Sequence, residues 1–245
     1  MLESVNRNLE EERKMKILIV AILLFTVATS SAFATAQYPD KIVYLGEEYS
    51  LHTNPMSAYF AMHPDKRPVG GIRSTALWRG YVATLEFKTN SLVLKDIEIE
   101  ILNEEKNDTF WKSAKDVVVP KDKDLLVDWF TGILVLPHGK LMNYVHMGYG
   151  STYSDYILLE IKSGKLTGRR NFDYKQYEEF KEKQFQAFKK TKEYRNRAED
   201  LKKEEWTQEN IDNFLRSFIV RYTSEFLDVE EEEPSSSKAI DSDKQ

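Results

Sequence analysis

The chain has 245 residues, of which 41% are hydrophobic and 31% are charged. This length and composition suit a single globular domain with a substantial apolar core. The formal net charge of -5 argues against a sequence-independent nucleic-acid binder, because such a protein needs a basic surface to neutralise phosphates. The chain has no cysteine, which excludes disulfides and a lipid-modified cysteine, so stability has to come from packing and hydrogen bonds.

Residues 1–36 have the organisation of an N-terminal extension followed by a secretory signal peptide. Basic residues precede the apolar run 17–28, and the small-residue stretch 32–36 follows it. These three regions are what export and signal cleavage require. We therefore predict an exported protein, periplasmic or extracellular, that contacts the membrane only transiently through this segment. Cleavage after Ala34 and cleavage after Ala36 fit the pattern equally well.

An uncleaved signal anchor in the membrane is the alternative interpretation of the same segment. A membrane-spanning helix needs about 20 mainly apolar residues, whereas Thr29, Ser30 and Ser31 interrupt this run. The interruption favours cleavage.

The residues ahead of Met15 do not fit a signal peptide well. Several of them are glutamates, which place negative charge where the region is normally basic. Residues 10–14 read Glu-Glu-Glu-Arg-Lys, and purine-only codons of the kind found in a bacterial ribosome-binding site can encode this stretch. We predict that translation of a bacterial gene begins at Met15.

The region from 40 to 172 has the pattern of antiparallel strands joined by tight turns. Three stretches of alternating apolar residues flank turn residues, and they predict hairpins over residues 41–51, 80–101 and 156–170. A further strand is predicted over 125–136, with a turn at Thr131-Gly132 as an alternative within it. The alternation changes phase at Lys95-Asp96, which predicts a β-bulge.

Helical signals occur once before the strands end and twice after Phe172. Asn54 and Pro55 predict the start of a short helix that runs to Met62. After Phe172 the apolar period becomes 3.6, and a capping box at Asp173 and Gln176 opens one amphipathic helix. Thr207 is the expected N-cap of a second, with Trp206 and Ile211 as a hydrophobic staple and an apolar stripe of Ile211, Phe214, Leu215, Phe218, Ile219, Tyr222 and Phe226.

These elements predict one α+β domain over residues 37–227. Its sheet is antiparallel and has about six to eight strands, and both a flat and a strongly curved sheet fit the pattern. The sheet packs against the C-terminal pair of amphipathic helices. Residues 228–245 are acidic and then serine-rich, which predicts a disordered tail.

Recognisable catalytic and metal-binding motifs are missing from the sequence. There is no G-x-S-x-G elbow, Walker loop or dinucleotide-binding glycine turn. The four histidines, His52, His63, His138 and His146, lack the spacing of a zinc helix. We predict no cofactor and no metal site.

The first candidate binding region is the stretch 74–81, in which Arg79 lies between the aromatic residues Trp78 and Tyr81. A guanidinium held against an aromatic ring can bind a carboxylate or a sugar. The alternative interpretation is structural. In that case Trp78 and Tyr81 belong to the core, and Arg79 pairs with a carboxylate such as Asp128.

The second candidate is the stretch 144–153, which contains two glycines together with Tyr144, His146, Tyr149 and Tyr153. Glycine lets the backbone approach a ligand closely, tyrosine stacks and hydrogen-bonds, and histidine exchanges protons near neutral pH. The alternative is a glycine bend between strands whose tyrosines cover the sheet. Polar, glycine-rich loops on rigid sheets are nevertheless where binding residues concentrate.

Three segments, residues 74–84, 144–153 and 180–190, resemble segments of an uncharacterised bacterial family of exported proteins of unknown function. The resemblance extends over most of residues 40–227. It carries no activity, fold or site residue.

Aromatic richness together with glycine loops favours a non-catalytic exported protein that binds a small ligand or a partner protein, and no nucleic acid. Its expected contacts are Trp78, Arg79, Tyr81, Tyr144, His146, Tyr149 and Tyr153. One alternative is a cell-envelope glycan hydrolase, with His146 and the carboxylates Asp128 or Glu98 as acid and base. Another is an immunity-like inhibitor of a toxin.

Overall fold

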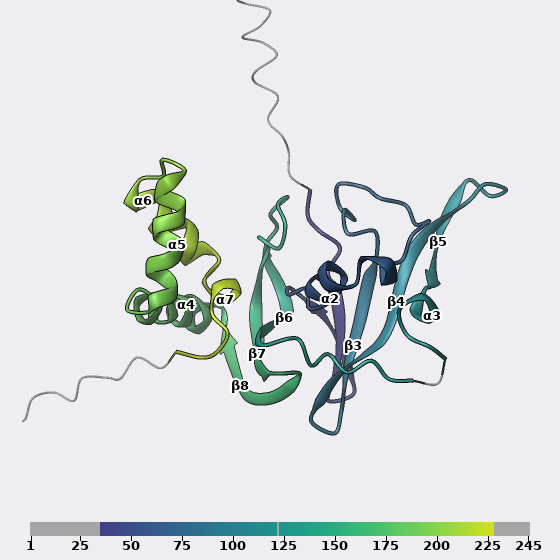
Figure 1. Cartoon of the computed structure of the whole chain (residues 1–245), viewed down its shortest axis with the longest axis horizontal. Helices are drawn as coiled ribbons and strands as arrows, with labels where there is room; N and C mark the ends of the chain where they lie inside the picture. Colours follow the sequence, from purple (N-terminus) through teal and green to yellow (C-terminus); the bar gives the residue numbers. More distant parts are fainter. Residues whose placement is uncertain (1–34, 122, 228–245) are drawn as a thin grey trace, which may run out of the picture. The chain divides into compact units, whose positions relative to one another are not determined.

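The computed structural model describes residues 35–121 and 123–227 (Figure 1). The predictions for the apolar run, for a start at Met15 and for the acidic tail 228–245 fall outside these residues. Within the described ranges the fold is the predicted α+β class, a largely antiparallel open sheet with several helices towards the C-terminus. No helix in these ranges is long and apolar enough to cross a membrane.

Eight strands form the sheet in the order β2-β1-β3-β4-β8-β7-β6, and β5 pairs with β4 beside this path. The only parallel pair among the described strands is β1 with β3. The strand bounds are β1 Asp40–Tyr44, β2 Glu47–Leu51, β3 Val82–Lys88, β4 Ser91–Asn103, β5 Asp108–Ser113, β6 Gly132–Asn143, β7 Thr152–Lys162 and β8 Lys165–Asp173.

All three predicted hairpins are confirmed: β1 pairs with β2, β3 with β4, and β7 with β8. Leu45 and Gly46 form the first turn, and both take positive φ, as a tight hairpin turn requires. The predicted bulge is also confirmed. Thr84 pairs with Asp96 and Leu85 with Leu94, which leaves Lys95 as the extra residue.

The sheet curves until its two ends approach each other. His52 follows β2, and its backbone N–H donates to the carbonyl of Val135 on β6 at 2.9 Å. The hydroxyl of Thr53 adds bonds to the backbone of Ile133 and Val135. These contacts bring β2 beside β6, although the sheet does not close into a barrel.

The first half of β6 and the middle of β7 are buried on both faces. Leu134 and Leu159 belong to the main core, which also contains Met56 and Phe60 of helix α2 (Met56–Met62). Ile133, Val135, Tyr156 and Leu158 face the other way and pack against Tyr177 and Phe180 of helix α4 (Tyr174–Phe188). Burial on both faces explains why residues 132–137 and 156–159 form continuous apolar runs in the sequence.

Helix α4 begins as predicted. The side chain of Asp173 accepts a bond from the backbone N–H of Gln176, and the Gln176 side chain accepts one from Asp173, which completes the capping box. Three further helices follow, α5 Lys192–Lys203, α6 Gln208–Ser217 and α7 Ile219–Tyr222. Thr207 caps α6 as predicted, but the ring of Trp206 meets that of Phe214 edge-on, and Phe218 of the predicted apolar stripe is exposed.

The C-terminal helices differ in whether they pack on the sheet or on one another. Helix α4 contacts β7 and β8, whereas α6 packs mainly against α4, α5 and α7. Phe185 and Phe188 at the end of α4 form a separate apolar cluster with Ile211, Leu215 and Ile219. The C-terminal helices therefore extend the domain with a small core of their own.

Some predicted elements differ in the structure. The strand expected over 125–136 begins only at Gly132, because the preceding segment meets β4 in an isolated bridge between Leu126 and Val93. Asn54 does not cap α2; Pro55 occupies the N-cap position, and the Asn54 side chain bonds elsewhere. Strand β5, the short helix α3 (Lys115–Val118) and the 3-10 turn η1 (Pro64–Lys66) were not predicted.

Candidate functional site

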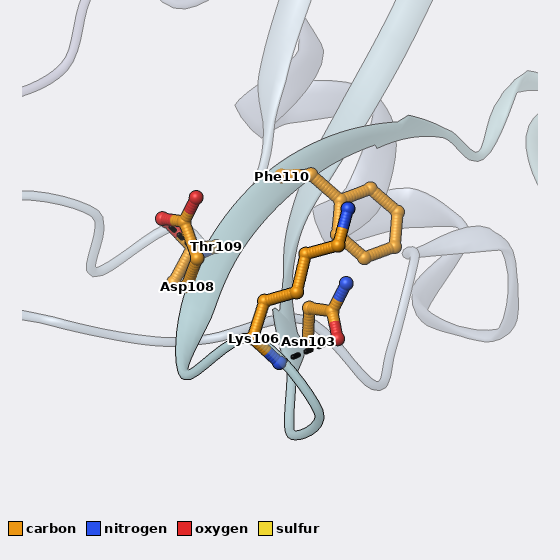
Figure 2. A pocket seen from close by; sticks show the side chains of 5 residues that line it. All are labelled: Asn103, Lys106, Asp108, Thr109 and Phe110. Atoms are coloured by element: carbon orange, nitrogen blue, oxygen red, sulfur yellow. Dashed lines mark hydrogen bonds between the residues drawn. The ribbon is translucent and has the colours of Figure 1, made fainter.

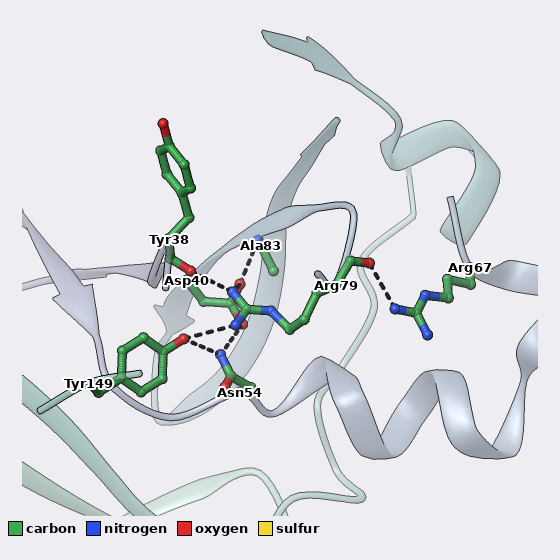
Figure 3. Close-up of polar contacts among 7 residues, drawn as sticks. All are labelled: Tyr38, Asp40, Asn54, Arg67, Arg79, Ala83 and Tyr149. Atoms are coloured by element: carbon green, nitrogen blue, oxygen red, sulfur yellow. Dashed lines mark hydrogen bonds and ion pairs between the residues drawn. The ribbon is translucent and has the colours of Figure 1, made fainter. Parts of the chain in front are cut away.

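A buried ion pair between Asp40 and Arg79 lies where β1 begins (Figure 3). Asp40 is fully buried and Arg79 is 3% exposed. Nη2 of Arg79 donates to Oδ1 of Asp40 at 3.2 Å and to the carbonyl of Tyr38 at 2.8 Å. The same carboxylate oxygen accepts the backbone N–H of Ala83 at 3.0 Å. The pair therefore joins the start of β1 to β3.

Tyr149 brings the loop between β6 and β7 into this pair. Its hydroxyl accepts from Nη1 of Arg79 at 2.9 Å and from Nδ2 of Asn54 at 2.9 Å. Asn54 also donates to Oδ2 of Asp40 at 3.2 Å. We call Asp40, Asn54, Arg79 and Tyr149 the Arg79 cluster. It connects four segments that are far apart in the sequence.

Burial sets the electrostatics of the cluster. Burial raises the pKa of Asp40, because it disfavours the charged carboxylate, and the charge of Arg79 and the donated hydrogen bonds partly offset this. Burial by itself would lower the pKa of Arg79. The negative charge of Asp40, with smaller contributions from Tyr149 and Tyr81, outweighs this effect, so the pKa of Arg79 is raised. Each charged group thus compensates the burial of the other, which a buried ion pair requires.

The Arg79 guanidinium is enclosed by protein. Nη1 and Nη2 are both engaged, while Nε is buried without a hydrogen-bond partner among the described residues. Tyr81 lies beneath it, with the guanidinium carbon 5.8 Å from the ring centroid, and burial raises the pKa of Tyr81 to about 12. Arg67 donates to the carbonyl of Arg79 at 2.8 Å. This arrangement offers little access to an external carboxylate.

His52 stacks on the other side of Tyr149. The two rings are 4.7 Å apart and 9° from parallel, and Tyr153 meets the His52 ring edge-on at 5.8 Å. Burial lowers the pKa of His52 to about 4, because the cation loses its hydration. His52 is therefore neutral at pH 7 and acts as an aromatic packing partner of the loop.

Other predicted site residues are exposed. Trp78 is 58% and Tyr144 55% exposed, so the interpretation of Trp78 as a core residue is wrong. The ring of His146 lies 4.7 Å from that of Tyr144 and meets it edge-on. Asp128 is exposed and is not the partner of Arg79. The structural interpretation of Arg79 named the wrong carboxylate, because Asp40 takes that role.

The first described residues lie between the two candidate regions. The backbone N–H of Gln37 donates to the carbonyl of Gly148 at 3.1 Å, and Ala36 forms a bridge with Gly148. The Gln37 side chain donates to the carbonyl of Thr75, and Tyr38 N–H donates to that of Ala76. Segments 35–38, 74–78 and 144–151 are thus neighbours at one end of the sheet.

Two hollows lie elsewhere on the described surface. One, of about 330 Å³, is at the β4–β5 hairpin (Figure 2), and its lining residues are Asn103, Lys106, Asp108, Thr109 and Phe110. The other, of about 300 Å³, lies between β8 and α4, and its lining residues are Arg170, Asn171, Phe172, Gln176, Glu179, Phe180 and Lys183. None of the predicted site residues lines either hollow. The described residues contain no group of three or more His, Asp or Glu placed to hold a metal ion.

Comparison of the chain with protein-family models, with curated proteins and with solved structures gave no match. The site is therefore interpreted from its geometry.

The structure brings together Arg79, Tyr81 and Tyr149 of the predicted site and places Tyr153 next to His52. The sequence analysis missed Asp40, Asn54 and His52. Asp40 directly follows Pro39 and opens a strand of apolar alternation. A carboxylate at the first position of a buried strand needs a partner. This position therefore indicates that Asp40 belongs to a buried polar cluster. In the sequence, the position of Asn54 before Pro55 indicates only a helix cap.

Proposed function

We propose that this chain is a non-catalytic, exported binding domain. It contacts its target through the exposed side chains of Tyr38, Trp78, Met142, Tyr144 and Met147, which we call the N-terminal surface. All five are exposed, and they lie on the three neighbouring segments around residues 35–38 and at the adjoining end of β6. Large exposed apolar groups gathered at one place are typical of interaction sites.

The observation that carries the proposal is the attachment of the loop beneath this surface. Tyr149 is fixed by Arg79 and Asn54 and stacked on His52, while Tyr144 and Met147 of the same loop point their side chains into solvent. A loop whose base is held in this way loses less conformational entropy when its tip binds. The buried polar cluster thus supports binding by the exposed residues beside it.

The geometry gives less support to a hydrolase. A glycosidase needs two carboxyl groups facing one cleft, and an acid–base histidine needs a partner within hydrogen-bond distance. His146 contacts an aromatic ring, and the exposed Asp128 lies in the segment that leads into β6. The N-terminal surface therefore suits recognition better than acid–base chemistry.

The absence of cysteine allows a clean test. We would express the full chain with one cysteine, Trp78→Cys or Met147→Cys, and compare maleimide labelling of the purified protein with labelling in the producing cells. Leu45→Cys is the matched control. Leu45 is exposed and apolar, and it lies in the β1–β2 turn, at the other end of β1 from Tyr38.

The proposal expects positions 78 and 147 to react quickly in the purified protein and severalfold more slowly in cells, with position 45 equally reactive in both. Equal reactivity of all three positions in cells would show that the N-terminal surface is unoccupied and would refute the proposal.

A further inference from the structure

Strand β5 forms an open edge of the sheet. The strands at the two ends of the main path, β2 and β6, lie beside each other, whereas β5 pairs with β4 alone among the described strands. Figure 1 shows the β4–β5 hairpin extending beyond its neighbours. An edge strand presents a row of backbone donors and acceptors with which another chain can pair. A further strand can therefore be added to the described sheet at β5.

The pairing of β4 with β5 fixes which backbone groups face this open edge. The N–H of Ala114, the residue after β5, donates to the carbonyl of Ile97 on β4 at 2.8 Å. Along an antiparallel strand, successive residues alternate between facing the paired strand and facing away from it. The residues of β5 whose backbone groups face the open edge are therefore Thr109, Trp111 and Ser113. The N–H of Thr109 is held by the carboxylate of its neighbour Asp108 at 2.7 Å.

Large apolar side chains are exposed along this edge. Phe110 and Trp111 are exposed on opposite faces of β5, and Leu102, which pairs with Thr109 from β4, is exposed as well. Such a strand favours association, but a lysine on an edge strand commonly prevents it. Strand β5 carries one lysine, Lys112. The charge that Lys112 meets on an added strand therefore decides whether pairing is favourable.

A second copy of β5 supplies the matching charge. Two copies can pair antiparallel with Thr109 of each opposite Trp111 of the other, so that the outward-facing backbone groups of both strands meet. In this register Phe110 lies opposite Phe110 on the two-fold axis, and Asp108 lies opposite Lys112 on both sides of the axis. Opposite charges and paired aromatic rings stabilise such cross-strand pairs. The sequence of β5 is therefore complementary to itself.

The neighbouring registers lack this match. A register with Trp111 opposite Ser113 places Lys112 opposite Lys112, and like charges directly opposite each other are destabilising. A register with Trp111 opposite Trp111 places Lys112 opposite Phe110, which leaves Asp108 without a basic residue opposite it. Of these three registers, the one with Phe110 on the axis is the register in which both charges are paired.

We propose that this protein forms a two-fold symmetric dimer through antiparallel pairing of β5 with β5 of a second copy. Asp108 binds Lys112 of the other copy, and the N–H of Thr109, released by Asp108, donates to the carbonyl of Trp111 of the other copy. Because each copy uses its open edge on the other, the assembly closes at two chains. This inference is independent of the proposed function.

The hollow at the β4–β5 hairpin lies beside this interface. It has a volume of about 330 Å³, and Asp108 and Phe110 are among the residues that line it (Figure 2). The hollow leaves room for the Lys112 side chain of the second copy next to Asp108. A strand of six residues gives a small interface, so we expect a dimer that dissociates on dilution.

The first test reverses the charges of the full chain. Asp108→Lys places a lysine opposite Lys112, and Lys112→Asp places an aspartate opposite Asp108. In sedimentation velocity, each variant alone should be monomeric at concentrations at which the wild type is dimeric. An equimolar mixture of the two variants restores opposite charges at both ends and should dimerise about as well as the wild type. Lys140→Asp, at an exposed position of β6, is the matched control and should dimerise normally.

Recovery in the mixture would also show that both variants are folded. A wild type that stays monomeric as its concentration rises would refute the dimer. Association that neither charge variant weakens, or a mixture that stays monomeric, would overturn the pairing through β5.

The second test measures the register. Directly opposite residues at a non-hydrogen-bonded position have Cα atoms about 4.5 Å apart, which is within the range of a disulfide. The chain has no cysteine of its own, so Phe110→Cys should form a disulfide-linked dimer on mild oxidation. Leu45→Cys, in the exposed β1–β2 turn, should stay monomeric under the same conditions. Efficient linkage of Trp111→Cys without linkage of Phe110→Cys would overturn the proposed register.

Discussion

The guanidinium of Arg79 donates to the hydroxyl of Tyr149 at 2.9 Å, across 70 residues of sequence. This bond joins the turn that leads into β3 to the loop between β6 and β7. Because Asn54 donates to the same hydroxyl, one phenol group holds both the loop and the segment before α2. The position of the loop that carries Tyr144 and Met147 therefore depends on the partly buried hydroxyl of Tyr149.

Tyr149→Phe is expected to loosen the loop while leaving the fold intact. The substitution removes the acceptor of two donors, and a buried donor without a partner costs about 1–3 kcal/mol. The ring stack with His52 remains. We expect a lower free energy of unfolding in urea and faster amide hydrogen exchange over residues 144–151. Tyr144→Phe is the control, because its hydroxyl lies on an exposed side chain; an equal effect of both substitutions would contradict the assignment.

Removing the carboxylate of Asp40 is expected to be more costly. Asp40→Ala leaves Arg79 as a buried cation without its partner, and breaking a buried pair in this way costs about 3–5 kcal/mol. The double variant with Arg79→Met should lose less than the sum of the two single variants, since the unpaired charge is gone. Urea unfolding of all three measures this coupling, and strict additivity would show that the pair is not a unit.

The matched control for this pair is exposed. Lys88 and Asp124 form an ion pair in which both side chains are about half-exposed. Surface pairs of this kind are screened by water and salt. Asp124→Ala should therefore leave the urea midpoint unchanged within the error of the measurement.

His52 predicts a pH dependence of stability. Its pKa is lowered from 6.5 to about 4 in the folded chain, so between these values the unfolded chain binds more protons than the folded chain. The stabilising contribution is complete above about pH 6.5 and is lost as the pH falls towards 4. Its full size is at most about 3 kcal/mol, less because the ring is partly exposed.

His52→Phe tests this contribution. Phenylalanine keeps a ring beside Tyr149 and cannot be protonated, so the fall in the free energy of unfolding between pH 6.5 and pH 4 should be smaller than in the wild type. His146→Gln, at an exposed position, serves as the comparison. Parallel curves for the wild type and His52→Phe would refute the contribution of His52.

Local signals predicted the hairpins and the helix starts because the chemistry of a turn or cap lies within a few residues. The hairpin over residues 156–170 and the capping box at Asp173 and Gln176 are of this kind. Strand β5 was missed because all six of its residues are exposed, so no alternation of apolar residues marks it. Its pairing with β4 depends on the neighbouring strand.

The site was only partly predictable for a similar reason. Arg79 was singled out because it lies between aromatic residues, but its partner Asp40 is 39 residues away and nothing near Arg79 in the sequence indicates it. Trp78 and Tyr81 have similar apolar character in the sequence, yet one is exposed and the other is in the core. Only the three-dimensional packing separates them.

Gln184 is expected to hold the end of the described chain against α4. Its buried amide donates to the hydroxyl of Thr223 and to the carbonyl of Glu225, and its oxygen accepts the N–H of Leu227. Gln184→Leu removes these bonds, at a cost of about 1–3 kcal/mol for the groups left unpaired. Limited proteolysis should then cut faster within residues 223–227. Gln186→Leu, whose exposed amide bonds only to Glu182 among the described residues, should not change the cutting rate.

Gly164 is expected to tolerate alanine poorly, and Gly46 provides the comparison. Both have positive φ, +72° and +86°, so alanine strains the backbone at each. At Gly164 an added Cβ would also lie 2.7 Å from the carbonyl oxygen of Val127, whereas at Gly46 nothing lies within 4 Å. Gly164→Ala should therefore lower the melting temperature clearly more than Gly46→Ala. An equal fall in melting temperature for the two variants would contradict this prediction. It would mean that only the backbone strain lowers stability and that the segment around Val127 moves away from the added Cβ without cost.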